Sequence, residues 1–259
     1  MNSTKESTTM AHDFQVRHEQ DLPVPPDHAW KALTTYDGNV GWLYPMEVEP
    51  RVGGTVSRGP STVLEWEPPH RFICRYADDT GFSNTLTYLV DEREGGTSHL
   101  RMSIHWVHEG TPDENWGTKT DAAEKHVHFY QHGLSQYLAH FDGRTAAYVR
   151  AMHGEPTSDP GQFATLQRHL GLADGTAAGD TVRLTLDAEL GGPQDAVVDY
   201  LDGDFLGLRT DDALYRIFNG STWNWPVWAG LHLFRDGVDK ERTARAWRAW
   251  LDRAVTPSA

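Results

Sequence analysis

A long amphipathic helix that follows two alternating strand segments is the feature that most limits the folds open to this 259-residue chain. In the strand segments apolar residues recur at every second position, which is the period of a half-buried strand. In the helix they recur at three- and four-residue spacing and form one stripe. This order predicts an α+β fold in which the helix lies across the concave face of a curved antiparallel sheet. The strand residues are Leu86, Tyr88, Val90, Leu100, Met102, Ile104 and Trp106, and the helix residues are Ala123, Val127, Tyr130, Leu134, Leu138 and Phe141.

Local signals set the expected limits of the helices. Asp121 and Glu124 form an acidic version of a capping box at the start of the long helix, and Gly143 stands where a C-cap belongs. Pro25 and Pro26 precede a shorter helix expected from about residue 27 to 36, with Asp27 as its cap. Short strands are expected at 14–22, 47–51, 54–57, 62–67 and 71–77.

Several of these pieces occur in an order that is typical of a known family. They are the Pro-Pro-Asp-His-Ala-Trp segment at 25–30, Trp42, the Gly-Gly pair at 53–54, and the strand that stops at Glu-Pro-Pro at 67–69. In this order and spacing the chain resembles the SRPBCC (START-like, helix-grip) superfamily, close to bacterial homologues of the heat-shock-protein ATPase activator and to the polyketide cyclase-like branch. The resemblance implies a helix-grip fold with a cavity between sheet and helix, and it covers only the first half of the chain.

The order of strands followed by a closing helix occurs twice, which suggests two domains. Residues 1–12 are expected to be a disordered tail, in which Met10 is an alternative start to Met1, and residues 13–145 to be the helix-grip domain. A Gly-, Pro- and Ser-rich linker is expected at 146–160. Residues 161–255 are expected to form a second, smaller unit, either an abbreviated helix-grip repeat or an accessory domain. Its expected strands are 182–186, 196–201, 205–210, 214–218 and 227–234, and its expected helices are 163–170 and 239–254.

Composition excludes several classes of partner. The formal net charge of −14 argues against nucleic acid and against an anionic membrane surface. No apolar run approaches the ~20 residues of a membrane helix, and the N-terminus lacks the apolar core of a signal peptide. A single cysteine fits a reducing, cytoplasmic location, and Cys74 alternates with apolar strand residues, which favours a buried position over a nucleophile.

The fourteen histidines raise the question of a metal site. His128 and His132 have the i, i+4 spacing of a helical zinc motif, but the residues between them include no glutamate. Both share a helix face with Lys125 and Gln136, and a solvated face is the favoured interpretation. The chain also lacks the motifs of nucleotide, flavin and nicotinamide binding. We therefore expect no metal and no cofactor.

Polar residues on the inward phase of the strands are the candidates for chemistry. His18 and Gln20 share the phase of Phe14 and Val16, and His108 shares that of the strand ending at Trp106. A buried polar side chain costs free energy unless it finds a partner, and a ligand-filled cavity supplies one. The alternative is that His18 and Gln20 reach solvent at a strand end or that a bulge reverses the phase. The candidate catalytic residues are His18, His108 and Tyr88, and the candidate ligand-binding residues are Gln20, Trp106, Tyr130 and Leu134.

Three tryptophans between residues 223 and 228 are too many to leave exposed on a monomer. They are expected to pack between the two halves or against a second copy of the chain, so a homodimer is one expected assembly. An aromatic platform for a ligand is the alternative.

Three functions of different classes follow from these expectations. The first is binding of a small hydrophobic or aromatic molecule in the cavity, with sequestration or resistance as a role. The second is a polyketide cyclase or aromatase activity, in which His18 or His108 acts as general base and Tyr88 donates a hydrogen bond to a developing enolate. The third, a chaperone ATPase cofactor, rests on the family resemblance alone and ranks last.

Overall fold

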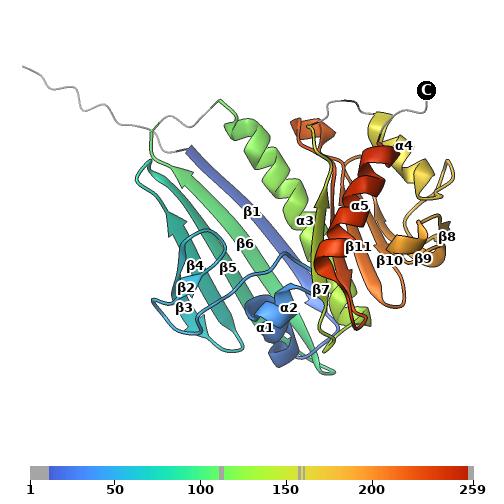
Figure 1. Cartoon of the computed structure of the whole chain (residues 1–259). Coiled ribbons are helices and arrows are strands. Elements are labelled where there is room, and N and C mark those ends of the chain that lie inside the picture. The colour runs from blue at the N-terminus through green and yellow to red at the C-terminus, as the bar shows by residue number, and fades with distance from the viewer. Residues whose placement is uncertain (1–11, 111–113, 157–158, 160, 256–259) are drawn as a thin grey trace, which may run out of the picture. The chain divides into compact units, whose positions relative to one another are not determined.

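The computed structural model describes residues 12–110, 114–156, 159 and 161–255 (Figure 1). Contacts divide the chain into two compact units. Unit 1 holds the residues up to Thr35 and Met46–His128, and unit 2 holds Tyr36–Pro45 and the chain from Phe129 onward. The long helix α3 (Trp116–His140) contributes its first part to unit 1 and its second part to unit 2. The tail expected at 1–12 lies outside the described residues apart from His12.

Unit 1 is a six-stranded antiparallel sheet with the strand order β1-β6-β5-β4-β3-β2 (Figure 1). Its strands alternate between buried and more exposed residues, as expected for a sheet with one covered face. Helix α1 (Pro26–Thr34) lies against the sheet, with Trp30 and Leu33 buried. The strands are β1 (His12–Leu22), β2 (Thr55–Val56), β3 (Ser61–Glu67), β4 (Arg71–Ala77), β5 (Phe82–Arg93) and β6 (Thr97–His108).

The first part of α3 lies on the covered face of this sheet. His128 of α3 contacts His18 of β1, and Trp116 of α3 contacts Trp106 of β6. Each strand residue in these pairs points to the same side as the buried Val16 and Ile104. A long helix that follows the sheet in sequence and covers its inner face is the helix-grip arrangement, so the predicted α+β, helix-grip fold class is confirmed.

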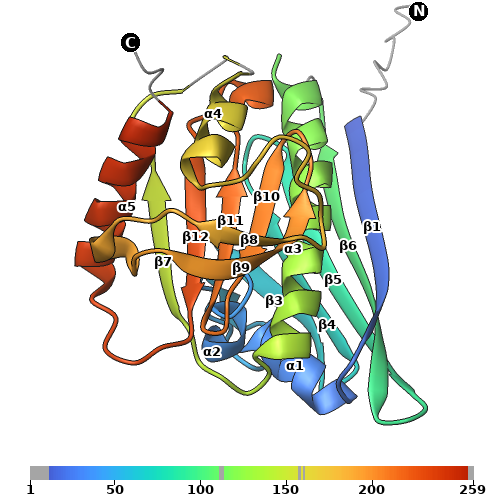
Figure 2. The ribbon, with the colours of Figure 1, turned by 90° about the vertical axis from the view of Figure 1, so that its right-hand side faces the viewer.

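Unit 2 contains a second six-stranded antiparallel sheet, with the order β7-β12-β11-β10-β9-β8 (Figure 2). Helices α4 (Gly161–His169) and α5 (Lys240–Ala254) supply Leu166, Trp247 and Leu251 to the core on one face of this sheet. The second part of α3 packs on the opposite face, where Phe129 stacks on Phe205 at 4.8 Å. The strands are β7 (Ala147–Met152), β8 (Thr181–Leu184), β9 (Gln194–Leu201), β10 (Phe205–Arg209), β11 (Ala213–Phe218) and β12 (Trp228–Leu233), with helical turns η1 (Ala188–Leu190) and η2 (Ser221–Trp223).

Two segments are placed differently from what the sequence suggests. The stretch 146–160, expected as a linker, contains β7, which pairs with β12 along its whole length. The second sheet therefore has as many strands as the first, and in this respect unit 2 is not the smaller one. The segment Tyr36–Pro45, which begins with helix α2 (Tyr36–Asn39), belongs to unit 2, because the Val40 carbonyl accepts a hydrogen bond from His232.

The helix starts also differ from the expected ones. α3 begins at Trp116, before Asp121 and Glu124, so those two residues lie inside the helix and do not form a capping box. Pro25 is the N-cap of α1, and Asp27 lies in its first turn. Asp27 in this first turn still interacts favourably with the helix dipole. The acidic residue therefore indicates the start of α1 although it is not the cap.

The tryptophans of residues 223–228 pack largely within unit 2. Trp228 stacks on Phe218 with ring centroids 3.5 Å apart, and Trp223 is buried against Phe205. Trp225 is the exposed member, with 38% of its surface accessible. The Trp225 ring lies 5.6 Å from that of Trp223, so all three rings have partners in their own unit, and the homodimer stays a prediction.

Candidate functional site

The strand register of unit 1 brings the predicted polar residues to one face. β1 pairs with β6 without a register shift, so that Phe14 lies opposite Trp106 and His18 opposite Met102. β5 continues the same row on the other side of β6, with Tyr88 next to Met102. No bulge reverses the phase of β1, and His18, Gln20, Trp106, His108 and Tyr88 all lie on the inner face.

His18 meets a second histidine that the sequence did not single out as its partner. Its Nδ1 lies 3.2 Å from Nδ1 of His128, and the ring centroids are 5.4 Å apart. At this distance one imidazole donates and the other accepts, which requires at least one neutral ring. Burial and, to a lesser extent, His128 lower the pKa of His18, while a hydrogen bond with Gln20 opposes this shift. His18 is therefore a base that stays neutral to lower pH than a free imidazole.

A cluster of aromatic rings surrounds Trp106 at the end of the same face. The Trp106 ring lies 5.3 Å from Phe14, 5.8 Å from Phe82 and 6.2 Å from Trp116. His108 joins the cluster through Trp116, at 6.1 Å. In the part of the chain that the structure describes, the Nε1 of Trp106 and the Nδ1 of His108 are buried and have no hydrogen-bond partner.

Tyr88 and Cys74 belong to the core of unit 1. Tyr88 is 2% exposed and stacks on Phe72 at a centroid distance of 6.0 Å. Cys74 is buried on the neighbouring strand, and burial raises the pKa of its thiol to about 11. The thiol is therefore protonated at neutral pH, which agrees with a packing role for Cys74.

Two of the predicted ligand-binding residues lie in unit 2. Leu134 is completely buried, and Tyr130 is half-buried with its ring 6.2 Å from Tyr44 and 5.7 Å from Phe218. The predicted set of site residues thus divides between the units: His18, Gln20, Tyr88, Trp106 and His108 lie together in unit 1. The roles assigned to these residues stay predictions.

His128 and His132 of α3 differ in exposure: His128 is exposed, as expected for a solvated face, whereas His132 is partly buried. His128 contacts His18 in unit 1, as described above, and Nε2 of His132 lies 3.3 Å from Oδ1 of Asp199 in unit 2. Within the described ranges, no group of three or more His, Cys, Asp or Glu side chains could hold a metal ion. His128 and His132 therefore have separate protein partners and do not share a ligand.

Unit 2 contains a buried ion pair that the sequence patterns do not predict. Nη1 of Arg216 donates to Oδ1 of Asp199 at 2.6 Å, and the two side chains are 2% and 3% exposed. Asp199 is placed by a register shift between β9 and β10, where Gly207 leaves the necessary room: a Cβ there would lie 2.2 Å from Oδ1 of Asp199. Burial raises the pKa of Asp199, but Arg216 and His132 outweigh it and hold the pKa below its usual value. A lone arginine in the apolar strand 213–218 was the one sequence signal of this pair.

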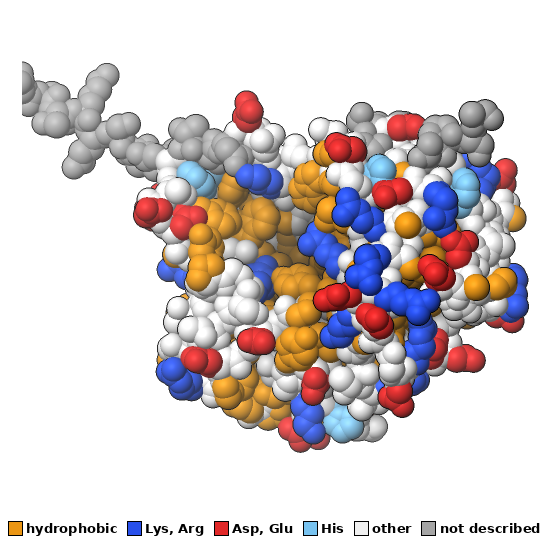
Figure 3. Space-filling view, viewed as in Figure 1, with side chains coloured by type: hydrophobic (Ala, Val, Ile, Leu, Met, Phe, Trp, Pro, Cys, Tyr) orange, Lys and Arg blue, Asp and Glu red, His pale blue; other side chains and the backbone are white. Residues whose placement is uncertain are grey.

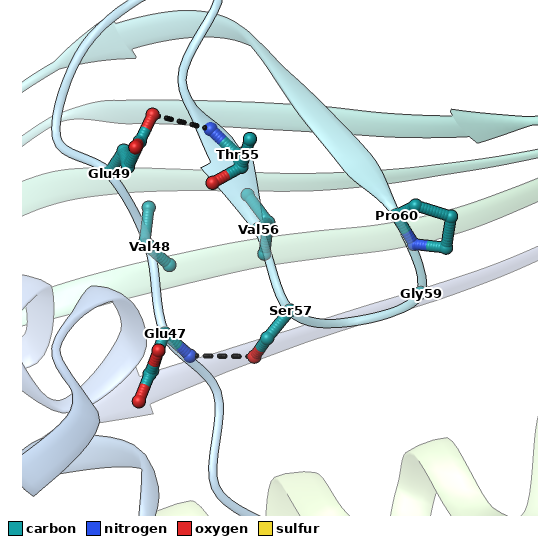
Figure 4. A pocket seen from close by; sticks show the side chains of 8 residues that line it. All are labelled: Glu47, Val48, Glu49, Thr55, Val56, Ser57, Gly59 and Pro60. Carbon is teal, nitrogen blue, oxygen red and sulfur yellow. Dashed lines mark hydrogen bonds between the residues drawn. The ribbon is translucent and has the colours of Figure 1, made fainter.

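A surface groove near β2 has a structural explanation. Figure 4 shows its lining residues, with Oε2 of Glu49 accepting from the Thr55 amide and the Ser57 hydroxyl accepting from the Glu47 amide. These hydrogen bonds tie the preceding loop to the edge of the sheet. The groove is open and its carboxylate at Glu49 is already engaged, also by Arg51. It is lined by Glu47, Val48, Glu49, Thr55, Val56, Ser57, Gly59 and Pro60.

Comparisons with known proteins leave the family of the chain open. No protein-family model matches the sequence, and no curated protein matches it. Among solved structures the chain is similar to the di-domain ARO/CYC BexL from the BE-7585A biosynthetic pathway, with 12% identity and a TM-score of 0.42 over 95% of this chain and 99% of that one. It is also similar to DynU16 from the dynemicin biosynthetic locus, with 15% identity and a TM-score of 0.40 over 93% of this chain and 95% of that one. A third similar structure is MLL2253 from Mesorhizobium loti, with 23% identity and a TM-score of 0.39 over 49% of this chain and 98% of that one.

At these TM-scores none of the three likenesses assigns a function to this chain. What its own topology defines is an α+β protein with a helix-grip unit and a second six-stranded unit. The superfamily resemblance and its ATPase-activator branch stay predictions. Among the helices of the described residues, none is long and apolar enough to cross a bilayer.

Proposed function

We propose that unit 1 binds a small aromatic or otherwise apolar molecule between the inner face of β1, β5 and β6 and the first part of α3. The observation that carries the proposal is the pair of buried nitrogen atoms on Trp106 and His108 that lack partners among the described residues. Leaving a buried polar atom unpaired costs about 1–3 kcal/mol. A ligand with a carbonyl or hydroxyl group would satisfy both atoms, since the indole N–H donates and the imidazole nitrogen donates or accepts.

The surrounding rings favour a flat ligand. Phe14, Phe82 and Trp116 contact the Trp106–His108 end of the face, and aromatic rings pack favourably at such distances. The His18–His128 pair lies four residues farther along β1 from Phe14, which corresponds to about 13 Å of extended strand. A fused-ring molecule with polar groups at its edge, as in an aromatic polyketide, matches this arrangement. Sequestration of such a molecule requires binding alone and no catalytic step.

We expect 1,8-dihydroxyanthraquinone, a neutral ring system with carbonyl and hydroxyl groups, to raise the melting temperature of the wild-type protein by linkage. Trp106→Ala and His108→Ala are expected to weaken binding about tenfold or more, since each removes a hydrogen bond to the ligand. His105→Ala is the matched control, because His105 lies on the same strand but on the outer face, paired with Asp13. Equal affinity of folded His108→Ala and wild-type protein would contradict the proposed site.

A second function, acid–base catalysis of the cyclase type, is favoured by the contact between His18 and His128. A neutral imidazole beside a bound ketone can remove a proton from the carbon next to the carbonyl. Because burial and His128 lower the pKa of His18, its neutral form, and with it the reaction, persists below the pH at which a free imidazole is protonated.

This second function predicts that the protein accelerates deuterium exchange at the methyl group of 2-acetylnaphthalene in D2O, followed by NMR. His18→Phe is expected to reduce the catalysed rate by about 10²-fold, the lower end of general-base contributions. The rate should rise with pH through the lowered pKa of His18 and then remain level. If His18→Phe retains the full rate, or if the pH profile is that of free imidazole, the chain is a binding protein without this chemistry.

A further inference from the structure

The edge of the second sheet carries an open groove lined by arginines. Arg150 of β7 and Arg245 and Arg248 of α5 surround it, together with Ala151, Met152 and Ala244. β7 is an edge strand, so the groove lies where the sheet ends and α5 passes over it. Figure 3 shows Lys and Arg side chains gathered over the part of unit 2 that Figure 1 labels α5. This concentration is unusual for a chain with a formal net charge of −14.

Arg150 is held in place by aromatic stacking. Its guanidinium carbon lies 4.9 Å from the centre of the Trp228 ring, and the other face of Trp228 stacks on Phe218 at 3.5 Å with an interplanar angle of 6°. A cation over an indole ring is attracted to it, and the two ring systems restrict the rotamers of a side chain that is otherwise exposed. The stack occupies one face of the guanidinium and leaves its N–H edges available.

Three arginines of α5 have acidic partners, and one of them, Arg245, also lines the groove. Arg242, Arg245 and Arg253 each lie within 4 Å of a carboxylate, those of Glu189, Glu241 and Asp187 respectively. Over the described parts of the chain, Arg150 and Arg248 form no ion pair. Although the chain has 37 acidic residues, those that the structure describes give no carboxylate partner to these two guanidinium groups.

Three phenols adjoin Arg150 on the same face of the second sheet. Tyr148 lies two residues before Arg150 in β7 and therefore points to the same side. Burial raises the pKa of Tyr148 to about 12, with Arg150 acting in the opposite direction, and burial also raises the pKa of Tyr130. Tyr44 completes the group next to Tyr130. At neutral pH the hydroxyls of Tyr148 and Tyr130 are protonated and can donate hydrogen bonds, so that Arg150 has further donors beside it.

We propose that unit 2 contains a binding site of its own for an aromatic carboxylate at this edge of the sheet. The N–H edges of Arg150 bind the anionic group, and the ring contacts the neighbouring phenols on the face that α3 covers, opposite α5. A planar guanidinium held by stacking matches the two oxygens of a carboxylate, and such charge-assisted pairs are strong and directional. Arg248 of α5 adds positive charge at the same edge of the sheet. This site is independent of the neutral-ligand site in unit 1, since the two share no residue.

Isothermal titration of the full chain with 2-naphthoate tests the site. Wild-type protein is expected to bind 2-naphthoate at least about tenfold more tightly than naphthalene-2-carboxamide, its neutral analogue. Arg150→Gln should abolish that preference, and Arg150→Lys, which keeps the charge but loses the fork, should retain only part of it. Arg242→Gln is the matched control, because Arg242 lies on α5 outside the groove, and it should bind as wild type does.

The outcomes separate this site from the one in unit 1. Trp106→Ala should leave 2-naphthoate binding unchanged, and Arg150→Gln should leave the anthraquinone shift unchanged. Equal binding of acid and amide, equal binding by wild type and Arg150→Gln, or no binding of 2-naphthoate at all would each overturn the proposal. Loss of 2-naphthoate binding in Trp106→Ala would place the ligand in unit 1 and overturn it as well.

Discussion

Replacing Asp199 with alanine is expected to lower the free energy of unfolding by about 3–5 kcal/mol, because it leaves Arg216 charged, buried and without a partner. Nε and Nη2 of Arg216 have no hydrogen-bond partner among the described residues. Loss of Asp199 would therefore leave the whole guanidinium group without an acceptor, which increases the cost. His132 would lose its contact with Asp199 at the same time. Urea denaturation of wild type and variant gives the difference directly.

The same strand supplies a matched control for this prediction. Asp195 of β9 pairs with Arg183 at 3.0 Å, but both side chains are largely exposed, at 72% and 61%. Asp195→Ala should therefore cost less than about 1 kcal/mol. The double variant Asp199→Leu with Arg216→Met should recover much of the stability lost by Asp199→Ala, since a buried ion pair is often replaceable by apolar residues. If Asp199→Ala costs no more than Asp195→Ala, the pair is not buried as described.

The strand pattern predicted the inner face of unit 1 because a sheet has a period of two. Once Phe14 and Val16 are inside, His18 and Gln20 must follow unless a bulge intervenes, and the register of β1 with β6 contains none. The same reasoning placed Trp106 and His108 next to each other on one face. The partner of His18 was not predictable in this way, because it comes from a helix that is distant in sequence.

The helix pattern was less informative because the two parts of α3 pack in different units. Val127 and Leu134 mark the expected apolar stripe, yet His128 contacts the first sheet and His132 the second. A single-stripe interpretation assigns both histidines to solvent, which holds for His128 but not for His132, whose partner Asp199 is buried. A helix whose two parts belong to different units does not follow the rule for a one-sided amphipathic helix.

The buried pair in unit 2 depends on backbone geometry that the sequence does not display. Asp199 follows the core residue Val198 and therefore lies on the same side of the sheet as Arg216, and the register shift opposite Gly207 and Leu208 leaves it without a paired residue on β10. Such shifts are set by contacts between strands. The arginine groove was not predictable from the sequence either. It depends on β7 being the edge strand beside α5, and the sequence pattern indicated a linker at this position.

His232 is expected to make the protein unstable toward acid. Its ring is buried, and burial, reinforced by Arg216, lowers its pKa to about 3 although it hydrogen-bonds the Val40 carbonyl. In the unfolded chain the same side chain titrates near the ordinary value of about 6.5. Between these two values the unfolded state binds one proton more than the folded state, so stability falls as the pH is lowered, by about 1.4 kcal/mol per pH unit.

The variant His232→Asn isolates this contribution, because an amide can still donate to the Val40 carbonyl but does not titrate. Between pH 7 and pH 5 the wild type should lose about 2 kcal/mol more than the variant, measured by urea denaturation at each pH. His169→Asn, at an exposed position of α4, controls for the general loss of a histidine. Asp199 also destabilises the fold on acidification, but it does so as the pH falls from the ordinary carboxyl value of 3.8 to its own lowered pKa, which is below the measured range, and it is common to all three proteins. Parallel pH profiles for wild type and His232→Asn would show that His232 is accessible to protons in the folded state, and the packing of Tyr36–Pro45 against β12 would then have to be looser than the structure indicates.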